Sequence, residues 1–334
     1  MAKPFKYEIL RELGRGSYGT VYEARFKKAG VSVAMKKVLC DSPEASELAL
    51  QELWTLSSMK KRHPNVIWLG ECILQRDQIF QKISKKSTES ESHLLLIETC
   101  LKGKCCFNLQ SSHFLWFVME FCDGGDMNDY LLSRGPDCRL NRTFMQQLSA
   151  AVVFLHLNQI IHRDLKPDNV LIANTQRGAV LKVADFGLSK ICQGRGSMNR
   201  RQMSTVCGSD FYMAPELWEG QYSAKVDIFA LGIMFWAMIE RITFRDIEVK
   251  KELLGIYFSK GRELVPVGKA LVENPSLELQ IPMKSKGVMN NYIQKLLRGM
   301  MAFNPQERPD ALSLQAQVEK VMFPGAKRGG PTRL

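Results

Sequence analysis

The sequence predicts an α+β fold in which a smaller, strand-rich amino-terminal part precedes a larger, helix-rich carboxyl-terminal part. Residues 7–38 alternate between apolar and polar side chains around a glycine-rich turn, as strands do. Residues 45–60 place apolar side chains near helical spacing. After Gly124-Gly125 the helical periodicity dominates. This change of pattern indicates two lobes with a cleft between them.

The other elements follow from periodicity and from chain breakers. His63-Pro64-Asn65 ends the first helix. Later strands are predicted at 66–69, 115–121, 170–172 and 181–183. Later helices are predicted at 144–157, 227–239 and 291–301.

A long excursion, residues 73–113, separates two of the predicted strands. Its middle, 84–92, is polar and rich in Ser, Glu and Lys, which predicts a mobile loop. Residues 93–101 are apolar again and predict an extra strand. The predicted domains are an N-terminal tail (1–6), a smaller lobe containing the excursion (7–121), a larger lobe (122–322) and a C-terminal tail (323–334).

Composition excludes several classes of protein. The formal charge is +12, but no basic run reaches the 5–8 residues of a nucleic-acid or nuclear-import patch, so no nucleic-acid partner is expected. The longest apolar stretch, 228–239, is about half of the roughly 20 residues that cross a bilayer, and no signal peptide is recognised, so no membrane role is expected. The nine cysteines form no CxxC pair, which favours reduced thiols in a cytosolic or nuclear protein.

A glycine motif opens the chain. Residues 13–21 (LGRGSYGTV) read GxGxxGxV, and glycines let a backbone turn close over a phosphate and aim N–H groups at its oxygens. A dinucleotide-binding turn has similar spacing but needs a helix directly after the glycines. Residues 20–26 continue as a strand instead, which favours a hairpin that covers a nucleotide.

Lys36 ends an apolar strand, 22 positions after Gly14. Such a lysine is usually a snorkelling surface residue, but at this distance from a phosphate loop it can reach the α- and β-phosphates. A carboxylate on the next helix can position it. Glu52 is the preferred candidate and Glu47 is the alternative.

The strongest single signal is residues 161–169 (IHRDLKPDN), which concentrate charge beside a hydrophobic helix and a strand. Asp164 can orient a substrate hydroxyl, and Asn169, five positions later, can reach a metal ion. Residues 184–187 (ADFG) supply Asp185 as a metal carboxylate, since one carboxylate and one Asn suit Mg²⁺. Residues 213–216 (MAPE) close the segment that follows.

Together these motifs resemble the eukaryotic protein kinase superfamily, serine/threonine type, over residues 7–321. The resemblance implies the bilobal protein kinase fold, ATP and Mg²⁺ as cofactors, and protein substrates with Ser or Thr acceptors. The implied enzyme is a non-specific protein serine/threonine kinase. Lys166, two residues after Asp164, is the feature similar to serine/threonine kinases rather than tyrosine kinases.

The resemblance also implies residue roles. The implied ATP-binding residues are Leu13, Gly14, Arg15, Gly16, Ser17, Tyr18, Gly19, Thr20, Val21, Ala34, Lys36, Met119, Glu120, Cys122, Asp126 and Leu171. The implied catalytic residues are Asp164 as base, Lys166 as γ-phosphate clamp, and the ion pair of Lys36 with Glu52. The implied Mg²⁺ ligands are Asn169 and Asp185. The implied structural groups are a hydrophobic column (Leu56, Leu69, His162, Phe186) anchored on Asp227, and an ion pair of Glu216 with Arg308.

Within the superfamily, residues 14–24, 115–134, 210–220 and 250–275 resemble the Clik-like group, the PDZ-LIM-protein-interacting kinases. This implies a nuclear location, with the cytoplasm as alternative, and a PDZ-LIM or actin-associated partner. One departure from the superfamily is Gly208-Ser209, where a Gly-Thr is usual; Ser keeps the hydroxyl.

Regulation is a hypothesis at this stage. Arg163 precedes Asp164, an arrangement that lets a phosphorylated activation segment dock, and Thr205, with Ser204 second, is the predicted phosphorylation site. Substrate preference stays open, since Ala237 stands where basic-directed kinases carry Glu while Asp126 can still attract a basic residue. One competing interpretation is a pseudokinase scaffold, which the presence of Lys36, Asp164, Asn169 and Asp185 disfavours. The other is an interaction protein that acts through 73–113 and 261–285.

Overall fold

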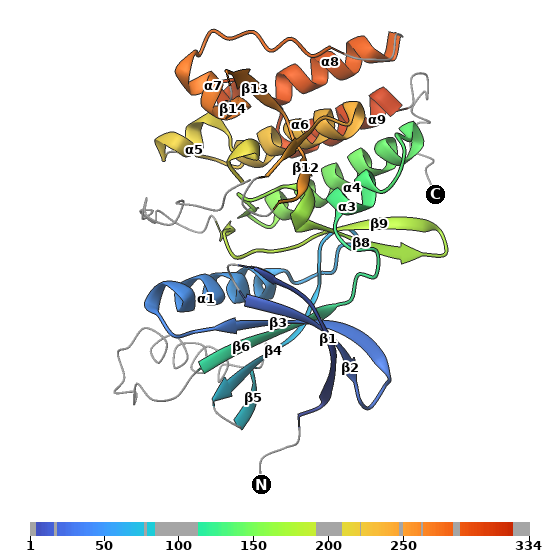
Figure 1. The fold of residues 1–334 in the computed structure, drawn as a ribbon, viewed down its shortest axis with the longest axis vertical. Helices are drawn as coiled ribbons and strands as arrows, with labels where there is room; N and C mark the ends of the chain where they lie inside the picture. Colours follow the sequence, from blue (N-terminus) through green and yellow to red (C-terminus); the bar gives the residue numbers. More distant parts are fainter. Residues whose placement is uncertain are drawn as a thin grey trace, which may run out of the picture. The chain divides into compact units, whose positions relative to one another are not determined.

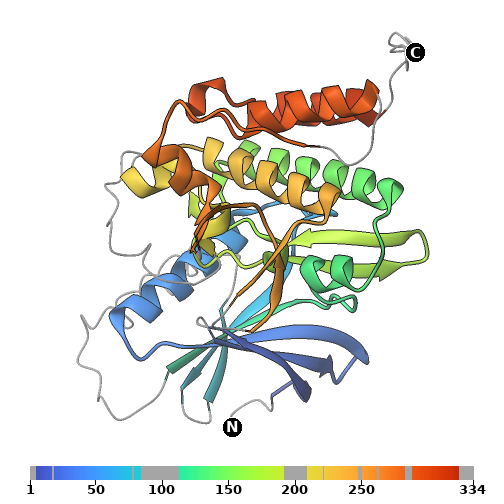
Figure 2. The same cartoon turned by 45° about the horizontal axis from the view of Figure 1, so that its top comes forward.

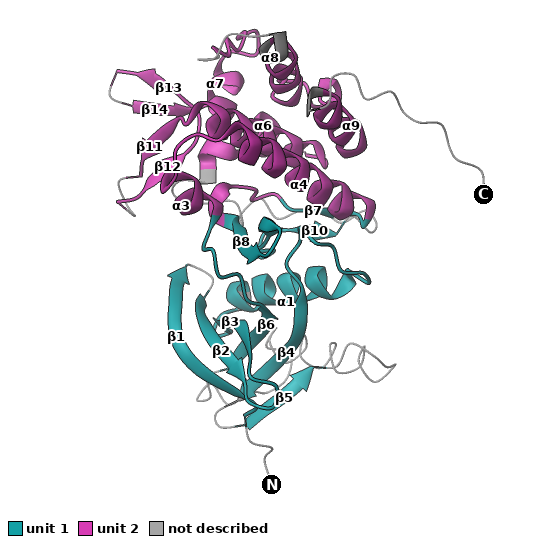
Figure 3. Ribbon diagram, turned by 90° about the vertical axis from the view of Figure 1, so that its right-hand side faces the viewer, with its two compact units in different colours: residues 1–126, 158–162, 169–192 teal, residues 127–157, 163–168, 193–334 magenta. Residues whose placement is uncertain are grey.

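The computed structural model describes residues 5–16, 19–76, 79–83, 113–191, 209–220, 222–246, 250–261, 263–282 and 288–322. The chain divides into two compact units, coloured separately in Figure 3. Unit 1 comprises residues 1–126, 158–162 and 169–192, and unit 2 comprises residues 127–157, 163–168 and 193–334. The predicted lobe boundary at 121/122 stays a prediction.

Unit 1 contains, within the described residues, a six-stranded antiparallel sheet in the order β1-β2-β3-β6-β4-β5 (Figure 1). Its strands are β1 (Tyr7–Gly16), β2 (Gly19–Phe26), β3 (Val31–Leu39), β4 (Leu69–Arg76), β5 (Ile79–Ile83) and β6 (His113–Glu120). The predicted strands at 7–38 and 115–121 are therefore confirmed. β6 lies between β3 and β4, so Met119 is opposite Ala34 on one side and Leu69 on the other.

The predicted helix at 45–60 is α1 (Pro43–Ser58). Its start has a clear local cause, because the Ser42 side chain accepts a hydrogen bond from Ala45 N (3.1 Å) and Pro43 occupies the first turn. α1 packs against β3 and β4 (Figure 1).

The two faces of the sheet have different roles because side chains alternate along each strand. On one face of β3, Met35 joins a buried cluster with Trp116, and Lys37 lies over the Trp116 ring. Lys36, its neighbour, points to the opposite face and contacts Glu52 of α1. Pleating thus separates an aromatic core from a charged site.

The rest of unit 1 follows later in the chain. It comprises the hairpin of β8 (Val170–Thr175) with β9 (Gly178–Val183) and the short pair of β7 (Ile160–Ile161) with β10 (Lys190–Ile191). Gly124 N donates to Ile172 O and Ile172 N donates to Gly125 O, both at 2.8 Å. The segment after β6 therefore runs beside β8.

Two predictions about this region were wrong. Residues 66–69 are not a strand of their own, because Val66 forms an isolated bridge with Val183 of β9 and Ile67 N donates to Val183 O. The sheet strand begins at Leu69, and residues 73–83 of the predicted excursion belong to β4 and β5 except at 77–78. The predicted loop and extra strand within 84–112 lie outside the described residues.

Unit 2 is largely helical. Its helices are α3 (Met127–Leu132), α4 (Cys138–Leu157), α5 (Pro215–Glu219), α6 (Lys225–Glu240), α7 (Val267–Glu273), α8 (Val288–Met300) and α9 (Ala311–Met322). α4 packs against α6 and α9, and α8 packs against α6 and α9 (Figure 2). The predicted helices at 144–157, 227–239 and 291–301 are confirmed as α4, α6 and α8, and each begins earlier in the chain than predicted.

α6 forms the core of unit 2. It is apolar on all sides, and its residues from Val226 to Met238 are buried. It ends where Arg241 adopts a left-handed conformation (φ 52°) and Arg241 N–H caps Ala237 O. This explains why the longest apolar stretch of the sequence is a buried helix. No helix among the described residues combines the length and apolarity that crossing a bilayer requires.

Between α6 and α7 lie two small hairpins that the sequence did not predict. They are formed by β11 (Thr243–Arg245) with β12 (Glu252–Leu254), and by β13 (Tyr257–Lys260) with β14 (Glu263–Pro266). Gly268 at the start of α7 lies so close to the backbone just before α5 that an added Cβ would be 2.0 Å from Met213 O. A sheet-containing unit followed by a mainly helical unit confirms the predicted α+β class.

Candidate active site

Lys36 is the centre of a buried ion cluster in unit 1. Its Nζ lies 3.0 Å and 2.8 Å from the two carboxylate oxygens of Glu52, and 3.0 Å from Asp185 Oδ1. The Lys36 residue is only 7% exposed. Glu52 is therefore the partner on α1, as preferred, whereas the alternative Glu47 is exposed. We call Lys36, Glu52 and Asp185 the Lys36 cluster.

Burial and charge compete in the Lys36 cluster. Burial alone would lower the pKa of Lys36, but the carboxylates of Asp185 and Glu52 outweigh it and raise that pKa. Burial raises the pKa of Glu52, which Lys36 opposes without overcoming. Burial also acts to raise the pKa of Asp185, but Lys36, His162 and the Gly187 N–H together hold it below its ordinary value. Lys36 is thus charged at neutral pH, and Asp185 is ionised.

Asp185 and Asn169 flank one end of the β8–β9 hairpin. Val170 is opposite Val183, and Ala184 N donates to Asn169 O (2.8 Å). Asp185 has a positive φ of 58°, which is unusual for a residue other than glycine and is typical of functional sites. Its side chain is 33% exposed, while Asn169 is 8% exposed.

The donor atoms of Asp185 and Asn169 fit the predicted metal. An ionised carboxylate and an amide carbonyl are oxygen ligands, and Mg²⁺ prefers few protein oxygens together with phosphate and water. Among the described residues, no group of three or more His, Cys, Asp and Glu side chains forms a metal site.

The glycine hairpin is formed by the ends of β1 and β2. Gly16 is opposite Gly19, while Ser17 and Tyr18 lie outside the described residues. Gly19 has a φ of 135°, and an added Cβ there would be 2.2 Å from Lys37 O. Position 19 therefore requires glycine for conformation and for space.

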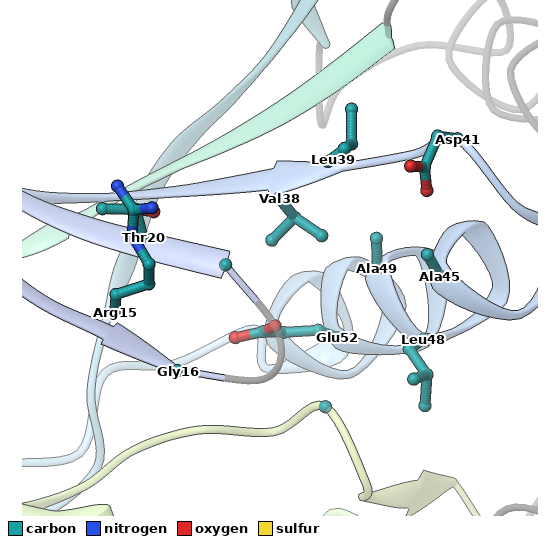
Figure 4. Close-up of a pocket in the computed structure, with 12 residues that line it drawn as sticks. Arg15, Gly16, Thr20, Val38, Leu39, Asp41, Ala45, Leu48, Ala49 and Glu52 are labelled. Atoms are coloured by element: carbon teal, nitrogen blue, oxygen red, sulfur yellow. The ribbon is translucent and has the colours of Figure 1, made fainter.

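A pocket of about 430 Å³ lies between this hairpin, the end of β3 and α1 (Figure 4). Arg15, Gly16, Gly19 and Thr20 line it from the hairpin, and Glu52 reaches into it from α1. Gly187 also lines the pocket. The glycine motif and Glu52, one member of the Lys36 cluster, thus line the same cavity within unit 1.

The predicted adenine-contacting residues are brought together in part. Ala34 and Met119 are opposite each other on β3 and β6, and Asp126 bridges Leu171. Val21 is opposite Lys36, which lies two positions after Ala34 along β3. Leu13 is 40% exposed on β1.

Glu120 is more constrained than its predicted backbone role requires. Its N–H donates to Trp68 O (3.3 Å), and its carboxylate accepts from Trp68 N (2.9 Å) and pairs with Lys182 (2.8 Å). Burial raises the pKa of the nearby Cys122 thiol to about 12. These contacts fix the last residue of β6, and the motif had not indicated them.

Asp164 and Lys166 form an ion pair in unit 2, with Nζ 3.1 Å from Asp164 Oδ2. Both side chains are largely buried, at 11% and 14% exposure. The preceding residue, Arg163, has a φ of 68°, and its N–H donates to Asp227 Oδ1 (2.9 Å). Asp227 is 1% exposed and also contacts His156 Nε2 (2.8 Å). A buried carboxylate at the start of α6 therefore holds the backbone beside Asp164.

The predicted hydrophobic column is buried in unit 1. Leu56, Leu69, His162 and Phe186 are each at most 1% exposed. The His162 and Phe186 ring centroids are 4.9 Å apart, and His162 Nε2 contacts Ala184 O (2.9 Å). The predicted anchoring of this column on Asp227 stays a prediction.

A link between α1 and the segment after Asp185 was missed. Ser189 is fully buried, and its hydroxyl lies 2.9 Å from Thr55 Oγ1. The Gln51 side chain donates to Ser189 O. These contacts tie the helix that carries Glu52 to the segment that carries Asp185. Thr55 and Gln51 lie one helical turn from Glu52 or beside it, and this is the signal that could have identified them.

The predicted Glu216–Arg308 ion pair is confirmed in unit 2. The Arg308 Nη atoms lie 2.6 Å and 2.8 Å from the two Glu216 oxygens. Arg308 is 1% exposed, donates to the carbonyls of Ala302, Phe303 and Lys225, and lies over the Phe229 ring. We call this the Arg308 pair.

Arg163 has a partner that the sequence had not indicated. Its Nη1 donates to the Tyr222 hydroxyl (2.6 Å), and its guanidinium lies over the Tyr222 ring. The predicted phosphorylation sites Thr205 and Ser204, and Gly208, lie outside the described residues.

Comparison with known proteins defines the class. The sequence model of the protein kinase domain family matches residues 7–318, and the chain belongs to this family. Serine/threonine-protein kinase ATG1c of Arabidopsis thaliana is 32% identical over 238 residues, which are 70% of this chain and 26% of the relative. Serine/threonine-protein kinase cds1 of Schizosaccharomyces pombe is 29% identical over 321 residues, which are 90% of this chain and 55% of the relative. The chain thus spans about a quarter to about half of the length of these relatives.

Proposed function

We propose that this chain transfers the γ-phosphate of ATP to Ser and Thr hydroxyls of protein substrates. The observation that carries the proposal is the Lys36 cluster, in which one buried ammonium contacts carboxylates from α1 and from the end of the β8–β9 hairpin. It is supported by the protein kinase family match over residues 7–318.

In this proposal unit 1 binds the nucleotide. Lys36 holds the α- and β-phosphates, and Glu52 fixes the position of the Lys36 ammonium. Gly14, Gly16 and Gly19 offer backbone N–H groups to the phosphates. Asp185 and Asn169 hold Mg²⁺, which supplies neutralisation of phosphate charge.

The adenine and ribose belong to the same unit in this proposal. Val21, Ala34, Met119 and Leu171 contact the adenine ring, and the backbone of Glu120 and Cys122 hydrogen bonds to it. Because Glu120 N–H already donates to Trp68 O, the Glu120 carbonyl is the group that we assign to the adenine. Asp126 contacts the ribose. Arg15, Ser17, Tyr18 and Thr20 complete the phosphate loop.

The acceptor chemistry belongs to Asp164 and Lys166 of unit 2. The substrate hydroxyl oxygen forms a bond to the γ-phosphorus while the bond from that phosphorus to the β–γ bridging oxygen breaks, releasing ADP. Asp164 takes the hydroxyl proton. Lys166 neutralises charge on the transferred phosphoryl group, and Asp227 keeps the backbone of this segment in place.

Labelled ATP and a generic acceptor protein test this function. The wild type should incorporate label as phosphoserine and phosphothreonine, whereas Asp164→Asn and Lys36→Met should lose at least about 100-fold in rate. The competing pseudokinase interpretation predicts no incorporation by the wild type. Equal incorporation by wild type and Asp164→Asn would contradict the proposed role of Asp164.

The choice of Ser and Thr over Tyr is supported by Lys166 and by relatives that are serine/threonine-protein kinases. Assignment to the non-specific protein serine/threonine kinase class is part of the proposal. Phosphoamino acid analysis distinguishes the acceptors directly, and phosphotyrosine as the main product would contradict it.

Activation by phosphorylation of Thr205, with Ser204 second, is also proposed. The added phosphate would pair with Arg163, whose guanidinium donates a hydrogen bond to the Tyr222 hydroxyl in this structure. Mass spectrometry of active protein should find the modified residue, and Thr205→Ala should lower activity. Full activity of Thr205→Ala in protein that lacks modification at both sites would contradict the idea.

Membership of the Clik-like group, a nuclear location and a PDZ-LIM or actin-associated partner are proposed from the segments quoted above. Deletion of 84–112 removes no residue of β4 or β5. Assays of this variant therefore test partner binding and catalysis separately. Lost binding to a PDZ-LIM protein with unchanged peptide phosphorylation would favour the interaction-protein interpretation of this segment. Exclusion of the tagged chain from nuclei would contradict the location.

A further inference from the structure

Lys251 bridges two carboxylates of unit 2. Its Nζ lies 3.0 Å from Asp129 Oδ1 on α3 and 3.5 Å from Asp168 Oδ1 in the segment that follows Asp164. The three side chains are partly exposed, at 32% for Lys251, 61% for Asp129 and 29% for Asp168. They form a charged surface patch, which we call the Lys251 bridge.

The hairpin that carries Lys251 is fastened to α3. Asn128 is fully buried, and its side chain donates to Glu252 O (2.9 Å) and accepts from Leu254 N (2.8 Å). Asp246 N donates to Lys251 O (2.9 Å) across the hairpin end. The backbone on both sides of Lys251 is therefore held, which fixes the point from which its side chain reaches both carboxylates.

A second contact joins the hairpin to the segment before α5. The Tyr212 hydroxyl donates to Leu254 O, and the rings of Phe211 and Phe244 stack with centroids 4.0 Å apart. Burial raises the pKa of Tyr212, and the carboxylates of Asp168 and Asp164 add to this effect. Tyr212 is therefore influenced both by Asp168 of the Lys251 bridge and by Asp164, the proposed base, which lies four residues before Asp168 in the chain.

Two carboxylates beside an acceptor site would attract a basic side chain of a protein substrate, because clustered charge of one sign selects partners of the opposite sign. Lys251 supplies such a cation from within the chain. A substrate lysine or arginine would have to displace it, at the cost of two existing ion pairs.

We propose that Lys251 is a specificity-determining residue that occupies Asp129 and Asp168 and so removes a preference for basic residues near the acceptor. The proposal rests on the proposed kinase function. It assigns the chain substrates whose neighbouring residues are neutral or mixed rather than strongly basic.

The test compares Ser-containing peptide pairs that differ only in Lys or Gln at positions flanking the acceptor. Wild type, Lys251→Met and Lys251→Arg are assayed with the full chain and ATP. Lys251→Met should raise kcat/KM for Lys peptides relative to Gln peptides by about two- to fivefold, the range of one partly exposed charge pair. Lys251→Arg keeps the cation and should keep the wild-type ratio.

The control is Lys260→Met, which removes the same charge from β13, where Lys260 is 74% exposed and pairs with Glu273 (3.5 Å). Adding Asp129→Asn to Lys251→Met should reverse part of the gain. An unchanged ratio in Lys251→Met, or an equal rise in Lys260→Met, would overturn the proposal.

A binding measurement separates this proposal from the proposed function. Fluorescence anisotropy of the labelled Lys peptide without ATP should show about two- to fivefold tighter binding to Lys251→Met than to wild type at low salt. If the wild type transfers no phosphate to any peptide, the kinase function fails, while the anisotropy result still decides the role of Lys251. Equal binding by both proteins would overturn that role.

Discussion

The Lys36 cluster of unit 1 and the Arg308 pair of unit 2 each place a buried cation against a buried glutamate, and both join distant segments of the chain. The two differ in the number of carboxylates that each cation contacts. Arg308 meets one carboxylate in two parallel hydrogen bonds, and its remaining N–H groups donate to backbone carbonyls. Lys36 meets two carboxylates, one of which, Asp185, keeps a third of its side chain exposed.

This difference distinguishes a cluster that stabilises the fold from one that is available to a ligand. The Arg308 pair is balanced in charge and satisfied in hydrogen bonds, so a ligand has nothing to add. The Lys36 cluster has one cation for two carboxylates, and one of these carboxylate side chains, that of Asp185, is partly exposed. A divalent cation would complete it, since the cation supplies the second positive charge, and nucleotide phosphates would then contact both Lys36 and that cation.

The largest expected loss of stability follows from removal of the Arg308 pair. Arg308→Met leaves Glu216 buried without its partner, which should lower the free energy of unfolding by about 3–5 kcal/mol. Urea unfolding measures it. The control is Arg11→Met, which removes a pair with Glu23 from a surface where Arg11 is 65% exposed, and it should cost at most about 1 kcal/mol. Equal losses in the two variants would remove the distinction.

Lys36→Met should impair phosphoryl transfer more than it impairs stability. We expect phosphoryl transfer to fall by about 100-fold or more. The free energy of unfolding should fall less than in Arg308→Met, because Glu52 can take a proton and Asp185 remains partly hydrated. Lys37→Met is the matched control, since Lys37 lies over Phe114 on the other face of β3. Unreduced transfer in Lys36→Met would contradict the account.

Much of the Lys36 cluster could be predicted because each member belongs to a motif with fixed spacing. The sequence did not reveal that Asp185 contacts Lys36 directly, since that contact depends on how the β8–β9 hairpin ends. The hairpins between α6 and α7 were missed because strands of three or four residues are too short for a period-two pattern to stand out. Lys251 and Asp168 are 83 positions apart, so no local pattern could pair them.

The fold was predicted best where a single physical preference dominates. α6 is apolar on every side, and α1 starts with Ser42 and Pro43, so their positions follow from local sequence. Residues 66–69 were misassigned because apolar residues that bridge β9 look like a strand. Burial of Val66 and Ile67, rather than extended pairing, explains their composition.

A smaller effect should follow from Gly19→Ala. The positive φ and the 2.2 Å approach of Lys37 O make any side chain strained at this position, so the free energy of unfolding should fall by about 1–3 kcal/mol. Gly16→Ala is the matched control on the same hairpin, because nothing lies within 4 Å of its added Cβ. Thermal or urea unfolding compares the two. A larger loss in Gly16→Ala would contradict the described geometry.

The smallest effect is a pH dependence from Asp185. Its pKa in the folded state lies below the ordinary value of 3.8, so its ionised form contributes stability above that pH and loses it as the pH falls through the folded-state pKa. The difference in unfolding free energy between wild type and Asp185→Asn should therefore shrink as the pH is lowered from about 6 to about 3. Urea unfolding over this range measures it, and a difference that grows on acidification would show that the pKa is not lowered.

The most direct test of the central claim, that the Lys36 cluster binds a nucleotide with its metal ion, is the rise in thermal-unfolding midpoint with ATP. It is measured with and without Mg²⁺ for wild type and Asp185→Asn, because a ligand that binds the folded state stabilises it in proportion to its affinity. The account predicts a rise for wild type that is larger with Mg²⁺, and loss of that Mg²⁺-dependent part in Asp185→Asn. No rise in wild type, or the full Mg²⁺-dependent rise in Asp185→Asn, would contradict it.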